Sequence, residues 1–158
     1  MKISRPIIIV LILVAFKGNA QDPVQWSFDT ASITLEEVSL NFSADIEPGW
    51  KLYAPSEDGD APVTPLSITL NTSPDYKVME ELEEQTTPVQ AFDPFFGMEI
   101  SWYEGTARLS QKIKLRHPRA TISGKVVYMA CNDRMCLPPR TEVFTLNVRN
   151  ANWEKKKN

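Results

Sequence analysis

Apolar and polar residues alternate without interruption over residues 38–46, so that every second side chain is apolar. Because successive side chains of a β-strand point to opposite faces, this pattern predicts a strand with one buried face. Other runs of the same kind predict further strands at 26–28, 50–53, 66–70, 76–79, 100–103, 107–115, 122–131 and 143–148. Turn residues separate these runs, and no stretch shows a convincing helical period. We therefore expect an all-β protein built as an antiparallel β-sandwich.

Two longer stretches, 54–65 and 86–97, lack this alternation. The first is rich in Pro, Asp and Gly and has the composition of a disordered loop. The second ends in Phe92-Asp93-Pro94-Phe95-Phe96-Gly97, whose three phenylalanines would be costly to leave in water. These rings are expected either to plug one end of the sandwich or to form a lid over a site. The four glutamates within residues 80–85 indicate a solvated loop.

The first twenty residues have the pattern of an export signal. Lys2 and Arg5 form a basic start, residues 7–16 are apolar, and Gly18-Asn19-Ala20 offers small residues for cleavage. The apolar run is shorter than the roughly 20 residues that a membrane-spanning helix needs. We expect cleavage after about Ala20, a β-sandwich domain over 21–150, and an exported protein in a setting that permits disulfides.

The charge of the chain argues against nucleic acid as a partner. Of 17 basic residues three lie in the predicted leader, and with 20 acidic residues the rest of the chain carries a net charge of −6. The segment 151–158 contains three consecutive lysines and is interpreted as a solvated basic tail.

Cys131 and Cys136 are the only cysteines of the chain. Asn132 and Asp133 favour a turn between them, so the cysteines are expected to face each other across a β-hairpin. Directly opposed positions lie about 4.5 Å apart at Cα, at the short end of the disulfide range, which makes a bridge feasible and open to strain. Closing so short a loop contributes only about 2 kcal/mol through loop entropy. Stability alone is therefore a weak reason for the pair.

The register of this hairpin predicts an irregularity nearby. Pairing the two cysteines would place Phe144 opposite Ser123, although the alternation requires Phe144 to point inward and Ser123 outward. We therefore predict a bulge or break, and place it at Pro138-Pro139, which cannot donate ladder hydrogen bonds.

Three interpretations of the cysteine pair are open on spacing alone. The first is a structural clip, which is the commonest role of paired cysteines in exported proteins. The second is a Cu(I) site, since Met129 and Met135 flank the cysteines and thioether and thiolate ligands suit that ion. The third is a redox-active dithiol, although the spacing is neither C-x-x-C nor a zinc pattern. The single His117 lies in a basic turn and is interpreted as an exposed loop residue.

The segment 124–139, Gly-Lys-Val-Val-Tyr-Met-Ala-Cys-Asn-Asp-Arg-Met-Cys-Leu-Pro-Pro, resembles the cysteine hairpin of the N-terminal periplasmic domain of DsbD-type thiol:disulfide interchange proteins. Residues 48–53, Pro-Gly-Trp-Lys-Leu-Tyr, are similar to that domain's early Gly-aromatic strand. Residues 93–99, Asp-Pro-Phe-Phe-Gly-Met-Glu, are similar to its cap loop. The resemblance covers about residues 26–148.

The resemblance implies an immunoglobulin-like fold whose cysteine pair takes electrons from a membrane-embedded thiol reductase and passes them to thioredoxin-like periplasmic proteins. It implies that Cys136 forms the mixed disulfide with partners and that Cys131 resolves it. It also implies an aromatic cap over the pair, a role that falls to Phe95, with Phe96 and Asp93 beside it. Three aromatic residues of the matching segments are expected to support the site: Trp50, Tyr53 and Tyr128. No cofactor and no metal is expected.

The chain departs from the best-known members of that family. Its cysteines are one residue closer together, and its cap has Pro94 at the second position. We expect the transmembrane and thioredoxin-like domains to be absent, and another protein to supply the reducing equivalents. Neither cysteine is expected at a helix N-terminus, and Asp133 offsets Arg134. The sequence therefore predicts thiols with an ordinary pKa of about 8.5 and slow exchange until a partner displaces the cap.

Overall fold

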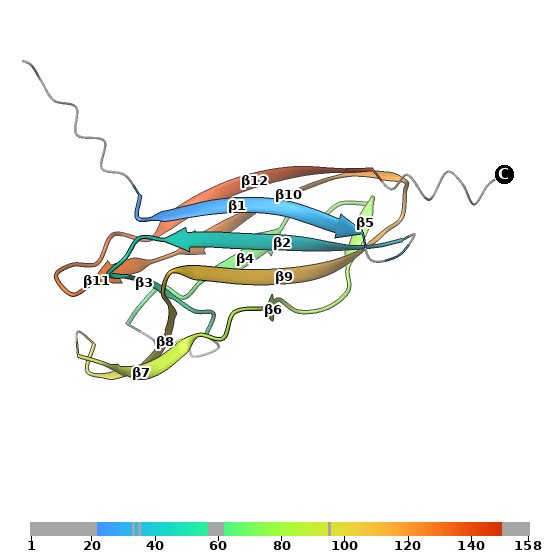
Figure 1. Ribbon diagram of the computed structural model, residues 1–158. Helices are drawn as coiled ribbons and strands as arrows, with labels where there is room; N and C mark the ends of the chain where they lie inside the picture. Colours follow the sequence, from blue (N-terminus) through green and yellow to red (C-terminus); the bar gives the residue numbers. More distant parts are fainter. Residues whose placement is uncertain (1–21, 33, 35, 57–61, 95, 150–158) are drawn as a thin grey trace, which may run out of the picture.

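The computed structural model describes residues 22–32, 34, 36–56, 62–94 and 96–149 (Figure 1). The predicted leader, the basic tail and Phe95 lie outside these residues. The described part contains twelve β-strands and no helix, which confirms the all-β prediction. It accordingly contains no helix that is long and apolar enough to cross a membrane.

The strands form three antiparallel sheets. The first has the order β1-β2-β9-β5, with β6 also paired to β9. Its members are β1 (Val24–Ser32), β2 (Glu37–Ile46), β5 (Tyr76–Val78), β6 (Glu83–Glu84) and β9 (Thr106–Leu115). The second has the order β12-β10-β4 and comprises β12 (Arg140–Arg149), β10 (Arg119–Tyr128) and β4 (Ser67–Leu70). The third has the order β11-β3-β8-β7 and comprises β11 (Ala130–Asn132), β3 (Trp50–Tyr53), β8 (Met98–Tyr103) and β7 (Val89–Asp93).

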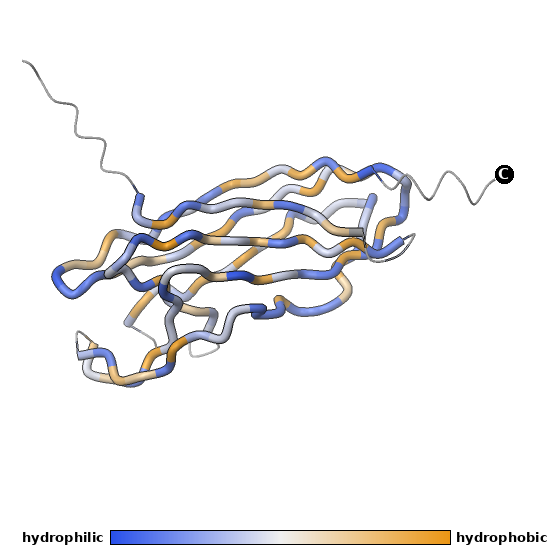
Figure 2. The backbone as a smooth tube through the Cα atoms, viewed as in Figure 1, coloured by the Kyte–Doolittle hydropathy of each residue, from blue (hydrophilic) through white to orange (hydrophobic). Residues whose placement is uncertain are grey.

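The first two sheets pack face to face as an immunoglobulin-like sandwich. Strand β2 alternates as predicted, because Val38, Leu40 and Phe42 are buried while the residues between them are more exposed. Figure 2 shows the same alternation of orange and blue positions along the long strands. Phe42 of the first sheet meets Phe144 of the second with ring centroids 5.4 Å apart. Burying such side chains contributes roughly 1.5–3 kcal/mol each.

Gly124 on β10 lies in close contact with the neighbouring strands β4 and β12 of the second sheet. A Cβ atom at this position would lie 2.4 Å from the Thr69 backbone oxygen and 2.8 Å from Cζ of Phe144. Gly124→Ala should therefore destabilise the protein by about 1–3 kcal/mol, because overpacking forces the backbone of β4 to move. Urea denaturation measures this effect. The exposed neighbour Lys125 provides the control, and a Gly124→Ala protein as stable as Lys125→Ala would contradict the predicted close contact.

Two strands lie where the sequence predicts loops. Strand β6 falls within the glutamate-rich residues 80–85, and β7 falls within the irregular stretch 86–97. Strand β7 lies at the edge of the third sheet, and most of its residues are exposed. Because buried and exposed residues do not alternate along it, the strand carries no period-two signal. The single strand predicted over 122–131 is in fact two, because β10 ends at Tyr128 and β11 starts at Ala130 in a different sheet.

The third sheet lies at one end of the sandwich, at the left in Figure 1, and has two different faces. Leu52 and Ala130 pack into the main core between the first two sheets. Their neighbours Tyr53 and Cys131 belong to a separate apolar cluster on the opposite face. The cysteine hairpin is therefore attached to the sandwich but faces away from its core.

Candidate functional site

The two cysteines form a disulfide across the predicted hairpin, with their Cα atoms 4.0 Å apart. The turn between them is built by Asn132. Its backbone N–H donates to the carbonyl oxygen of Met135 (2.9 Å), and its side-chain Oδ1 accepts hydrogen bonds from the N–H groups of Arg134 (2.9 Å) and Met135 (3.0 Å). The turn chemistry expected of Asn132 is therefore confirmed.

The predicted irregularity lies beside this hairpin. Strands β10 and β12 pair Tyr128 with Arg140, whereas the hairpin pairs Cys131 with Cys136 and bonds Leu137 N–H to the Ala130 carbonyl (2.9 Å). The two registers differ by one residue, so that Pro138-Pro139 stands opposite a single residue. The prediction of a break at the two prolines is confirmed, and its effect is to release the hairpin from the second sheet into the third.

The two sulfurs differ in accessibility. Cys131 lies at the centre of β11 and is only 2% exposed, while Cys136 is half-buried. An incoming thiolate must reach the sulfur that it attacks. Cys136 is therefore the accessible end of the bridge, and Cys131 is the shielded end.

An apolar cluster, which we call the redox face, surrounds the disulfide. It consists of buried Tyr53, Val63, Trp102 and Cys131 with partly buried Ala91, Phe96, Ile100, Met129 and Cys136. The ring of Phe96 meets that of Tyr53 edge-on with centroids 5.9 Å apart. Of the predicted cap, Phe96 thus lies on the redox face and Phe95 falls outside the described residues. Phe92 is 61% exposed and does not belong to this cluster.

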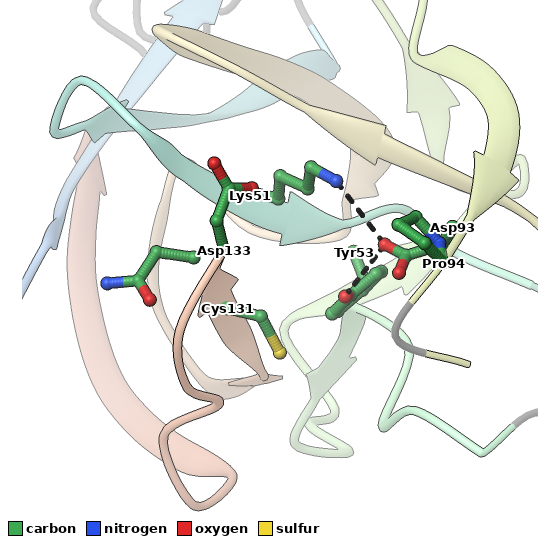
Figure 3. A pocket seen from close by; sticks show the side chains of 7 residues that line it. Lys51, Tyr53, Asp93, Pro94, Cys131 and Asp133 are labelled. Atoms are coloured by element: carbon green, nitrogen blue, oxygen red, sulfur yellow. Dashed lines mark hydrogen bonds and ion pairs between the residues drawn. The ribbon is translucent and has the colours of Figure 1, made fainter. Parts of the chain in front are cut away.

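Asp93 anchors the cap segment to the redox face. It ends β7 with only 2% exposure, and Figure 3 shows its carboxylate reached by two side chains of β3. The Tyr53 hydroxyl donates to Asp93 Oδ2 (3.4 Å), and Lys51 Nζ lies 3.4 Å from the same oxygen. The Asp93 carbonyl accepts a hydrogen bond from Gly97 N–H (2.8 Å), which closes the cap turn. Burial, and after it the charge of Asp93, raises the pKa of the Tyr53 hydroxyl, which therefore stays protonated as a donor.

A pocket of about 350 Å³ opens beside the disulfide. It is lined by Lys51, Tyr53, Asp93, Pro94, Cys131, Asn132 and Asp133 (Figure 3). The pocket brings charged and hydroxyl groups of β3 and β7 beside Cys131, which also belongs to the apolar cluster. Reactive thiols occur in partly exposed settings with a cation nearby, and Lys51 supplies a cation in this pocket.

Trp50 and Tyr128, expected to support the site, pack in the main core instead. The Tyr128 hydroxyl donates to Asp22 Oδ2 (2.8 Å), and burial together with this hydrogen bond raises its pKa. Trp50 starts β3, and Tyr128 ends β10 two residues before β11 starts. Tyr53, the third expected residue, is the one that the structure brings to the redox face.

Sequence reasoning missed Lys51, Val63 and Trp102. Val63 is buried on the redox face although it lies in the stretch 54–65, which has a disordered-loop composition. The adjacent Thr64 N–H donates to Met129 Sδ (3.4 Å), so this stretch covers part of the site. For Lys51 a signal was present, because alternation along residues 50–53 places it on the same side as Tyr53. Trp102 reaches this side through the pairing of β8 with β3, which places it opposite Tyr53.

Met129 is the feature that bears on metal binding. It packs in the redox face with both cysteines, whereas Met135 is 51% exposed. Among the described residues, no group of three or more His, Cys, Asp or Glu side chains is placed to hold a metal ion.

Comparisons with known proteins agree with this architecture. A family model described as "Thiol:disulfide interchange protein DsbD, N-terminal" matches residues 20–148. The N-terminal periplasmic domain of ScsB from Proteus mirabilis superimposes with a TM-score of 0.55 at 17% identity, over 86% of this chain and 52% of that one. The chain thus spans about half the length of that structure. The reduced N-terminal domain of Neisseria meningitidis DsbD gives a TM-score of 0.51 at 14% identity, over 77% of this chain and 85% of that one. A search of curated proteins found no match.

Proposed function

Because the chain belongs to the family of the N-terminal domain of the thiol:disulfide interchange protein DsbD, which takes part in thiol–disulfide exchange, we propose that it relays electrons between proteins through Cys131 and Cys136. The donor would be a membrane-embedded thiol reductase and the recipients thioredoxin-like disulfide proteins. One observation carries this proposal, namely that the disulfide joins a shielded sulfur to an accessible one on a face separate from the folding core.

The relay needs two exchange steps in each direction. A donor thiolate attacks Sγ of Cys136, the donor–Cys136 bond forms, the Cys131–Cys136 bond breaks, and the electron pair stays on Sγ of Cys131. A second donor thiolate then attacks the donor sulfur of this mixed disulfide and releases Cys136. The donor pair is thereby oxidised and the cysteine pair gains two electrons. The reverse sequence reduces the disulfide of a recipient.

We also propose that the relay operates in the periplasm. The predicted leader at 1–20, with cleavage after about Ala20, supports this location, as does the description of the similar ScsB domain as periplasmic. The division into a leader, a domain over 21–150 and a basic tail at 151–158 belongs to the same proposal.

The equilibrium reduction potential of the Cys131–Cys136 pair tests the relay. We expect a value between about −270 and −180 mV, the range spanned by thioredoxin and protein disulfide isomerase. Equilibration with glutathione or dithiothreitol buffers, followed by thiol counting, gives this value. A potential well below about −300 mV would identify a structural bridge and would contradict the relay.

A Cu(I) carrier is the second candidate, because Met129 packs with both cysteines on the redox face. We favour the relay, since the Met129 thioether already accepts the Thr64 N–H and Met135 is half-exposed. Tight retention of Cu(I) by the reduced protein against a competing chelator, lost in a Met129→Leu, Met135→Leu variant, would favour the carrier instead.

A further inference from the structure

Lys51 is the direct cross-strand partner of Cys131. Strands β3 and β11 are antiparallel and pair Lys51 with Cys131, between the pairs Trp50 with Asn132 and Leu52 with Ala130. Directly opposed residues of such a pair project from the same face with their Cβ atoms about 5 Å apart. The lysine side chain therefore starts beside the shielded sulfur, and both residues line the same pocket.

Two contacts hold the Lys51 ammonium within this pocket. Its Nζ atom lies 3.4 Å from Asp93 Oδ2 and 4.2 Å from the centre of the Trp102 ring. Attraction to the aromatic face and to the buried carboxylate stabilises the ammonium in this position. The lysine side chain is only 21% exposed, so its charge is less screened by water than that of a surface lysine.

The reaction creates negative charge on a sulfur that lines the same pocket as this ammonium. When Cys136 is attacked, Sγ of Cys131 leaves with the electron pair, and in the reverse step the Cys131 thiolate attacks Sγ of Cys136. The titratable groups that line the pocket with Cys131 are Lys51 and Tyr53 from β3, Asp93 from β7, and Asp133 from the hairpin. The two carboxylates disfavour a thiolate there, and Lys51 is the cation in this set.

We propose that Lys51 is a positioning residue for the exchange reaction, whose charge stabilises the Cys131 thiolate and offsets Asp93. The inference rests on the proposed relay, because it assumes that Cys131 is the sulfur that leaves and returns. It replaces the expectation of thiols with an ordinary pKa, which considered only the neighbours of the cysteines in the sequence. A lower pKa of the leaving thiol speeds its departure.

Lys51→Met tests this role. We expect reduction of the disulfide by dithiothreitol at pH 7 to slow by about three- to fivefold. A rise of about one pKa unit at the leaving sulfur has this effect, because its negative charge is only partly developed in the transition state. In a Cys136→Ala background, in which only one thiol remains, the thiolate absorbance of Cys131 should appear at a pH about one unit higher after Lys51→Met. Lys51→Arg, which keeps the charge, should preserve most of the wild-type rate and the wild-type titration.

Two controls separate charge from packing. Lys114 lies on β9, and its Nζ atom is ion-paired to Glu36 at 3.1 Å. Lys114→Met should leave the rate of reduction by dithiothreitol and the titration of Cys131 unchanged. Asp93→Asn added to Lys51→Met should recover part of the lost rate, because the opposing charge is removed. The inference is overturned if the Cys131 thiolate appears at the same pH with and without Lys51→Met. It is also overturned if dithiothreitol reduces the Lys51→Arg variant as slowly as the Lys51→Met variant. A wild-type potential typical of a structural bridge would instead refute the relay, while the titration of Cys131 would still report on Lys51.

Discussion

Cys131→Ser should trap a partner on Cys136, whereas Cys136→Ser should abolish exchange. With Cys131 replaced, the accessible Cys136 can attack a disulfide, but no second thiolate is present to release the product. With Cys136 replaced, the remaining thiol belongs to a residue that is only 2% exposed and meets the partner poorly. Incubation of each reduced variant with glutathione disulfide, followed by intact mass measurement, distinguishes a stable adduct from none.

A double Cys131→Ser, Cys136→Ser variant serves as the control for non-specific adducts. Rapid adduct formation by Cys136→Ser, together with slow reaction of Cys131→Ser, would reverse the assignment of the two sulfurs. It would then be Cys131 that meets partners, and the accessibility difference between the cysteines would not govern the reaction.

Removing the cap should accelerate both directions of exchange with small reagents. Phe96 packs edge-on against Tyr53 over the redox face, and Phe95 precedes it in the cap segment. Losing about 1.4 kcal/mol of cap closure raises the open fraction tenfold, so Phe95→Ala with Phe96→Ala should speed reduction by dithiothreitol and oxidation by a small disulfide by about an order of magnitude. Stopped-flow tryptophan fluorescence or quenched thiol counting measures both rates.

Phe92→Ala is the matched control, because this phenylalanine lies in the same segment but is 61% exposed. It should leave both rates unchanged. If the double alanine variant kept wild-type rates and lost several kcal/mol of stability instead, Phe95 and Phe96 would be core residues rather than a cap.

The half-buried strands of the sandwich were predictable because their alternation records a buried face directly. Strand β2 shows this over its whole length. The irregularity at Pro138-Pro139 was also predictable, since the cysteine pairing and the inward direction of Phe144 imply registers that differ by one residue. In both cases the signal lies in residues close together in the sequence.

The parts that sequence reasoning missed depend on contacts between distant segments. Strand β7 borders the sheet with little burial, so its composition resembles that of a loop. The sheet change at Met129 leaves the alternation of the run intact and thus unmarked. In the sequence, the charged residues nearest to Cys131 are Asp133 and Arg134. Lys51 lies beside Cys131 only because β3 pairs with β11.

Strand β3 has a consequence for how proteins of this kind can diverge. Its four residues alternate between two environments, with Leu52 in the main core and Lys51 and Tyr53 lining the pocket beside the disulfide. A mutation at Lys51 can alter the charge near the sulfurs while Leu52 stays packed in the main core. Selection can therefore adjust the charge beside the disulfide in a single-residue step, without a compensating change in the core.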